Sequence, residues 1–418
     1  MQDLRTTSRG LTDLPAELLH MICAQLTNDT SYMRCFSRVC RQIRVVALEY
    51  LNFRCISMRG VTSFDPLVRF LRAYPRVAAT VQSLHLRGAM DHNRDEFSLR
   101  LTTIIDNTHV ASVVECLPNL GSLVLEYFQY ALPAPSTTLA PALGPFPLST
   151  LTITGDSEGP RQSSLTGILR IVSLFTLEHL GRMDLGRLLK TDAPFEPDLL
   201  LRPLDIQELE LGPAYLCMHL RAFTVSLRSD SLRVLRVLHI DSGESVRALG
   251  KLLKHAGGNI TTLELDLSLP VTPSGRVGWV DPLKDNWQKL HVSTCTKLES
   301  ISLPVFLGYR KQPVGEPIVG ILSQVPPTLR KVTIYATGLC RLMTVQECTA
   351  YKVNDLDEAL SPIRFPHLQQ CLIQECPDWA HSAPGGYWPK CVSAVRRALK
   401  GLHERRLLTM VGDDSDSE

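Results

Sequence analysis

A short apolar pattern returns along most of the chain, in which one apolar residue is followed three and five positions later by two more. Ten segments between residues 81 and 373 fit it: VQSLHL, LGSLVL, LSTLTI, LGRMDL, IQELEL, LRVLHI, ITTLEL, LESISL, LRKVTI and LQQCLI. Between them lie stretches with the spacing of amphipathic helices, such as 216–227 and 245–255. A strand, turn and helix repeated this often restricts the chain to a stacked array in which each unit contacts its neighbours.

The pattern resembles that of leucine-rich repeats, with units that are longer and less regular than the usual repeat of about 20 to 29 residues. The expected fold class is α/β: an irregular leucine-rich-repeat-like solenoid with parallel strands on the concave side and helices outside. We expect the solenoid at 81–390, after a junction and first repeat helix at 52–80. A C-terminal capping helix is expected at 391–408, followed by an acidic, disordered tail at 409–418.

Four insertions interrupt the predicted array. Residues 131–147 contain five prolines and no charged residue, which predicts an extended loop. The others, around Trp279, around Tyr309 and from Trp379 to Trp388, combine proline and glycine with aromatic residues. These aromatic side chains would either contact a partner or pack back on the edge of the repeats.

The first fifty residues follow a different pattern. Leu14, Leu18, Ile22 and Leu26 recur every four residues, which predicts an amphipathic helix that starts near Pro15. Two further short helices are predicted from residue 32 to about 40 and from 43 to 51. Three helices of this size cannot bury much surface alone, so a partner or the following domain must cover them.

Residues 11–51 resemble the F-box, whose signature is a Leu-Pro-x-Glu-Leu-Leu opening, apolar residues in the next turns and a later Val-Cys pair. Ile43 stands where the family usually has tryptophan. The resemblance implies a three-helix module that binds a Skp-family adaptor through the matching residues Leu14, Pro15, Glu17, Leu18, Leu19, Ile22, Leu26, Val39 and Cys40.

The combination of the two regions is similar to F-box proteins with loose leucine-rich repeats of the fungal type. That resemblance implies a substrate-recognition subunit of an SCF-type (Skp, cullin, F-box) ubiquitin ligase. The adaptor would link the chain to a cullin–RING ligase while the repeats hold the target protein, so the chain itself would carry out no covalent chemistry. The alternative is a repeat scaffold that binds proteins without any ligase, and the sequence leaves both readings open.

The predicted concave face is acidic in its middle strands, because residues between the buried positions point to that face. In the sixth segment, Leu235, Leu238 and Ile240 are taken as buried; the other register would bury Leu232, Leu235 and Val237. With that choice, six carboxylates share the face, and we predict that they either engage a basic segment of the protein substrate or form a solvated surface: Asp184, Glu208, Glu210, Asp241, Glu264 and Asp266.

No sequence motif points to catalysis, a metal or a cofactor, so a non-catalytic protein with none of these is expected. His403-Glu404 begins like a zinc-protease helix, but Leu407 stands where the second histidine should be. The net charge of +2 is too small to gather nucleic acid or a membrane surface. The chain also lacks an apolar run of the roughly 20 residues that span a bilayer, a secretory signal and C-x-x-C pairs. We therefore expect a cytoplasmic or nuclear protein.

Overall fold

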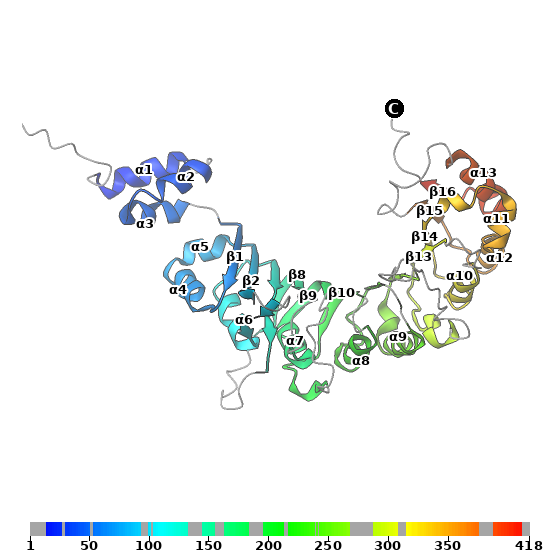
Figure 1. The fold of residues 1–418 in the computed structure, drawn as a ribbon, viewed down its shortest axis with the longest axis horizontal. Helices are drawn as coiled ribbons and strands as arrows, with labels where there is room; N and C mark the ends of the chain where they lie inside the picture. The colour runs from blue at the N-terminus through cyan, green and yellow to red at the C-terminus, as the bar shows by residue number, and fades with distance from the viewer. Residues whose placement is uncertain are drawn as a thin grey trace, which may run out of the picture.

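A computed structural model shows a three-helix unit followed by a curved solenoid (Figure 1). Parallel strands line the inner side of the arc, and helices cover its outer side. The structure describes residues 14–26, 30–50, 53–92, 99–101, 103–132, 144–154, 163–183, 195–212, 216–238, 240, 242–267, 287–307, 315–375 and 388–411. In these ranges no helix is long and apolar enough to cross a membrane.

The inner side is one parallel sheet in which the strands follow one another in chain order. Two small two-stranded sheets, β3 (Met90–His92) with β4 (Leu99–Leu101) and β5 (Ile104–Ile105) with β7 (Gln129–Tyr130), lie outside it. The main sheet contains β1 (Cys55–Val61), β2 (Ser83–Gly88), β6 (Ser122–Glu126), β8 (Phe146–Thr154), β9 (Phe175–Met183), β10 (Asp205–Leu211), β11 (Val234–Val237), β12 (Thr262–Leu265), β13 (Ser300–Phe306), β14 (Lys331–Thr337), β15 (Gln370–Glu375) and β16 (Leu408–Val411).

Helices on the outer side alternate with these strands, and several begin at a side chain that accepts hydrogen bonds from the first turn. Such caps are Asp106, Ser164, Ser242 and Thr344. The helices are α4 (Asp65–Ala73), α5 (Pro75–Thr80), α6 (Asn107–Val114), α7 (Leu165–Val172), α8 (Leu216–Ser226), α9 (Gly243–Ala256), α10 (Gly315–Leu322), α11 (Val345–Ala350), α12 (Asp355–Ala359), α13 (Trp388–Ala398) and α14 (Lys400–Glu404).

The solenoid core is a column of apolar side chains that runs from strand to strand. Neighbouring members pair in register, and each is at most 1% exposed. Full burial of one such side chain stabilises the fold by about 1.5–3 kcal/mol relative to exposure. The column comprises Leu84, Leu123, Leu151, Leu180, Leu209, Leu235, Leu263, Ile301, Val332 and Cys371.

Each of the ten predicted segments overlaps a strand of the sheet, but two were placed three residues too late. In the fourth, Leu177 pairs with Ile206 and Leu180 with Leu209, so the unit begins at Leu177. The sixth segment follows the register that we did not prefer, which buries Leu232, Leu235 and Val237; Leu238 is half-buried.

The solenoid is also longer at both ends than predicted. It begins at β1, inside the predicted 52–80 junction. The helix predicted at 391–408 corresponds to α13 and α14, but it does not end the array, because these helices lead into a further strand, β16, which pairs with β15. Asp357 of α12 fixes this last unit by accepting hydrogen bonds from the backbone N–H groups of Gly401 and Leu402, both at 2.7 Å. Residues 412–418 of the predicted tail and 133–143 of the proline-rich loop lie outside the described residues.

The N-terminal unit consists of α1 (Ala16–Leu26), α2 (Thr30–Phe36) and α3 (Arg41–Tyr50). It has a core of its own, in which Leu19 and Cys23 of α1 pack with apolar residues of α2 and α3. Val77 of the solenoid helix α5 also belongs to this core and is 2% exposed. The following domain therefore covers part of the unit, as its small size requires.

Candidate functional site

The surface of α1 carries most of the residues that match the F-box signature. Pro15, Glu17 and Leu18 are exposed, whereas Leu14 and Ile22 are half-buried. Leu26 and Cys40 are also half-buried, and Val39 is exposed in the turn between α2 and α3. Eight of the nine residues thus retain accessible surface, although they are spread over more than one side of the unit.

Leu19 is the exception among the nine. Its side chain is completely buried, in the core that it shares with Cys23 and Ile43. Leu19 therefore holds the three helices together and presents no surface to a partner. The structure thus places this predicted contact residue in the core of the unit, whereas Leu14, Leu18 and Ile22 retain accessible surface.

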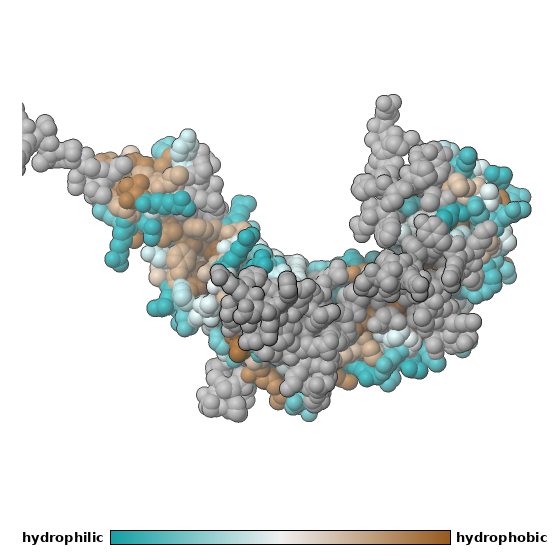
Figure 2. All heavy atoms as spheres, in the orientation of Figure 1, coloured by the Kyte–Doolittle hydropathy of each residue, from teal (hydrophilic) through white to brown (hydrophobic). Residues whose placement is uncertain are grey.

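Exposed apolar side chains are concentrated on this small unit. In soluble proteins, contiguous apolar surface marks contact sites, whereas isolated apolar residues are ordinary. Figure 2 shows apolar surface over the region of α1. Of the twelve large apolar residues that are exposed in the described ranges, five belong to residues 14–50: Leu18 (42% exposed), Met21 (65%), Tyr32 (65%), Val39 (53%) and Val45 (43%).

The concave face forms a second candidate surface, on which strand pairing brings charged side chains together. His179 of β9 pairs with Glu208 of β10. One row further along the strands, Glu210 of β10 pairs with Arg236 of β11, and Arg236 pairs with Glu264 of β12. We call these five residues the central charge ladder.

Ion pairs connect the ladder across four strands, from β9 to β12. The Nδ1 atom of His179 lies 3.2 Å from Oε2 of Glu208. The Nη1 atom of Arg236 is 3.5 Å from the same carboxylate oxygen, and its Nε atom is 3.7 Å from Oε2 of Glu264. Since all four side chains are partly exposed, each pair contributes little to stability, and the net charge of the surface matters more.

In the central charge ladder, the Glu264 side chain is more enclosed than that of Glu208. Burial raises the pKa of its carboxyl group, and the nearby charges of Glu210 and Asp266 raise the pKa further, while Arg236 lowers it. A cation that approaches this position would favour the ionised form of Glu264, which is the behaviour expected of an acidic contact site.

The ladder is less acidic than the strip predicted from sequence. Glu208, Glu210 and Glu264 lie on the concave face as predicted. Asp266 is largely buried instead: it is 6% exposed just beyond β12, where its backbone carbonyl accepts a hydrogen bond from the N–H of Ile240. Asp184 and Asp241 lie outside the described residues.

The sequence-based strip left out Arg236, because only the register that was not preferred, with Leu232, Leu235 and Val237 buried, places Arg236 on the concave face. The signal was present in the repeat LRVLRV, which matches the IQELEL segment before it and the ITTLEL segment after it. Aligning these three segments places Arg236 between Glu210 and Glu264.

A smaller charged group lies at the N-terminal end of the same face. The Nε2 atom of His85 on β2 is 3.0 Å from Oε2 of Glu126 on β6, which is close enough for an ion pair. The geometry of this contact is not that of a hydrogen bond. The Arg87 guanidinium stacks over the Tyr127 ring at 4.5 Å. Within the described ranges, no group of three or more histidine, cysteine, aspartate or glutamate side chains is arranged to hold a metal ion.

Comparisons with known proteins leave the family of the chain open. No protein-family model matches the sequence, and no curated protein is similar to it. Among solved structures, the chain is similar to the leucine-rich repeat-containing protein LegL7 from Legionella pneumophila. The similarity has 14% sequence identity and a TM-score of 0.39, and it covers 83% of this chain and 98% of that protein.

Proposed function

We propose that the chain is the substrate-recognition subunit of an SCF-type ubiquitin ligase in the cytoplasm or nucleus. In this proposal, α1 and its neighbours bind a Skp-family adaptor, which connects the chain to a cullin–RING ligase. The solenoid holds a protein substrate. The chain supplies proximity, because it raises the local concentration of a substrate lysine near the ubiquitin carrier.

One observation carries the proposal: the three-helix unit exposes five large apolar side chains, and Leu18 among them belongs to a Leu-Pro-x-Glu-Leu-Leu sequence. A unit that already has its own core has no folding reason to expose Met21, Tyr32 and Val39. Docking on an apolar partner surface would bury them, and a few such anchors usually provide most of the binding energy.

Copurification tests the proposal. A tagged full chain should recover a Skp-family adaptor and a cullin, and replacing Leu14 and Pro15 together by Ala should remove both. The matched control is Val225→Ala with Ile363→Ala, which truncates two exposed apolar residues of the solenoid. Recovery of adaptor at an equal level from the Leu14 and Pro15 variant would overturn the assigned contact.

A repeat scaffold without a ligase role is the second candidate. The replacement of the usual F-box tryptophan by Ile43, which is fully buried here, favours it. This function predicts that the tagged chain recovers protein partners through the solenoid while neither adaptor nor cullin appears.

A further inference from the structure

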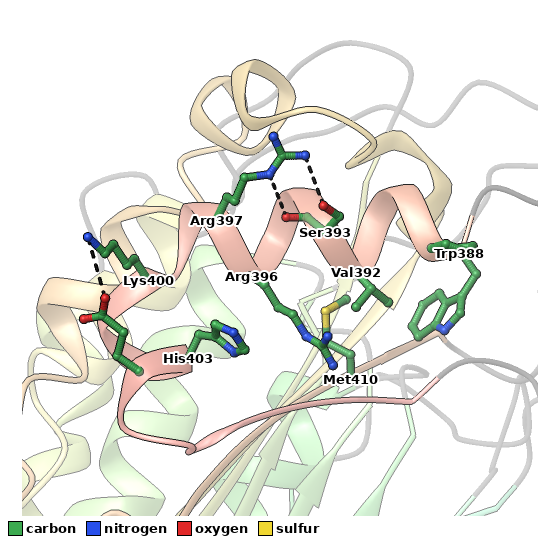
Figure 3. Close-up of a pocket in the computed structure, with 10 residues that line it drawn as sticks. Trp388, Val392, Ser393, Arg396, Arg397, Lys400, His403 and Met410 are labelled. Atoms are coloured by element: carbon green, nitrogen blue, oxygen red, sulfur yellow. Dashed lines mark hydrogen bonds and ion pairs between the residues drawn. The ribbon is translucent and has the colours of Figure 1, made fainter.

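The last unit of the solenoid ends in an open groove. Figure 3 shows α13 above β16, with Arg396 and Val392 of the helix pointing towards Met410 of the strand, and Trp388 at one end. The groove has a volume of about 820 Å³. Its lining is Trp388, Pro389, Val392, Ser393, Arg396, Arg397, Lys400, His403, Glu404 and Met410.

The groove borders the edge of the main sheet. β16 pairs with β15 on one side and is the last strand in the order of the sheet. The backbone carbonyl of Leu407 accepts a hydrogen bond from Cys371 of β15. Because successive residues of a strand direct their backbone groups to opposite sides, those of Leu408 and Met410 point to the other edge, where no strand of the described residues pairs with β16. Such an edge is a template for another strand.

Positive charge surrounds the apolar floor of the groove. Arg396 is exposed, and no carboxylate of the described residues pairs with it. Lys400 lies 3.6 Å from Glu404, a pair of exposed side chains that water screens strongly. The Arg397 guanidinium donates to Oγ and to the backbone carbonyl of Ser393, and Figure 3 shows it turned away from β16. Arg396 is therefore the cation that faces the groove.

We propose that this groove binds an acidic segment of a partner protein, which adds to the free edge of β16 as a further strand. The backbone of the segment pairs with Leu408 and Met410. Its apolar residues pack on Val392, Met410 and Trp388, while its carboxylates meet Arg396. The site is separate from the N-terminal unit and from the central charge ladder, so it does not depend on the proposed ligase function.

Fluorescence polarisation on the full chain tests the site with a labelled peptide that repeats Val-Glu-Glu, which places acidic and apolar residues on both faces of an extended strand. Arg396→Glu should weaken its binding by about tenfold or more, equivalent to about 1.4 kcal/mol. Arg397→Glu is the matched control, because it makes the same charge change on the same helix away from the groove. Equal weakening in both variants would reduce the effect to long-range electrostatics and overturn the proposal.

Three further measurements distinguish strand addition by a partner segment from other occupants of the groove. Hydrogen exchange of β16 amides should slow when the peptide binds, and unchanged exchange would contradict strand addition. A labelled single-stranded oligothymidine should bind much more weakly than the peptide, whereas equal binding would assign the groove to a nucleic acid. Deleting residues 412–418 should leave the peptide affinity unchanged. Tighter binding after the deletion would assign the groove to the chain's own acidic segment and overturn a partner.

Discussion

The guanidinium of Arg236 on β11 lies 3.5 Å from the carboxylate of Glu208 on β10, in the middle of the concave face. Arg236 also approaches Glu264 on β12. Arg236 therefore lies between two carboxylates, and it pairs in register with Glu210 of β10. The acidity of the central charge ladder depends on three glutamates, and Arg236 offsets part of it.

Reversing the three glutamates should abolish capture of a basic segment. We expect the wild type to bind a labelled lysine-rich peptide with an affinity that falls steeply as salt is added. The triple variant Glu208→Lys, Glu210→Lys and Glu264→Lys should lose this binding. The control reverses three exposed glutamates away from the concave strands, Glu115, Glu196 and Glu358. If the peptide binds both variants and the wild type alike across a range of salt, the face is only a solvated surface.

Arg236→Met should act in the opposite direction. It keeps an unbranched apolar stem for packing but removes the guanidinium and its positive charge from between Glu208 and Glu264. The same peptide should bind more tightly, mainly through faster association. Weaker binding to this variant would show that Arg236 positions the glutamates rather than offsetting them.

The sequence predicted the strands more reliably than their register. LxxLxL patterns overlap with themselves at an offset of three, so Leu235 satisfies both registers of LRVLRVLHI. Only pairing with the neighbouring strands decides between them: Leu235 lies between Leu209 and Leu263. This choice buries Val237 and places Arg236 on the concave face, which a single unit viewed alone cannot reveal.

The ends of the array were hard to predict for a different reason. The strand β16 contains only four residues, LTMV, and follows a basic amphipathic helix that resembles a cap. Its strand character comes from pairing with β15, a contact between residues distant in sequence. In the three-helix unit, the helices followed from their apolar spacing, but separating core Leu19 from exposed Leu18 required the packing of α2 and α3.

His219 makes the stability of the solenoid dependent on pH. Its ring is fully buried in α8, and neither nitrogen has a hydrogen-bond partner among the described residues. Burial lowers its pKa from 6.5 to about 4. The unfolded chain then binds the proton more readily, so stability is complete above pH 6.5 and falls as the pH drops towards 4.

Urea denaturation of the wild type and of His219→Leu measures this contribution. Between neutral pH and about pH 5, the wild type should lose roughly 2 kcal/mol more of its unfolding free energy than the variant. Other titrating groups are common to both proteins and cancel in the difference. Parallel pH profiles for the two proteins would show that His219 is not held neutral in the folded state.

Gly250 allows α9 to approach the short 3-10 helix Trp287–Leu290. A methyl group at this position would collide with the backbone carbonyl of Lys289, which cannot move like a side-chain end. Gly250→Ala should therefore cost about 1–3 kcal/mol of unfolding free energy through overpacking. Gly258→Ala is the control, since nothing lies within 4 Å of its added methyl group. Equal stability of the two variants in urea titrations would contradict the close packing.

The most direct test of the account is the affinity of the full chain for a purified Skp-family adaptor, measured by isothermal titration calorimetry. Leu18→Asp places a charge in the exposed apolar surface of α1, and Val225→Asp places the same charge on an exposed apolar residue of α8. We predict that the wild type and Val225→Asp bind the adaptor equally, whereas Leu18→Asp shows no binding. Absence of binding by the wild type, or equal binding by all three proteins, would contradict the assignment of the three-helix unit as an adaptor-binding module.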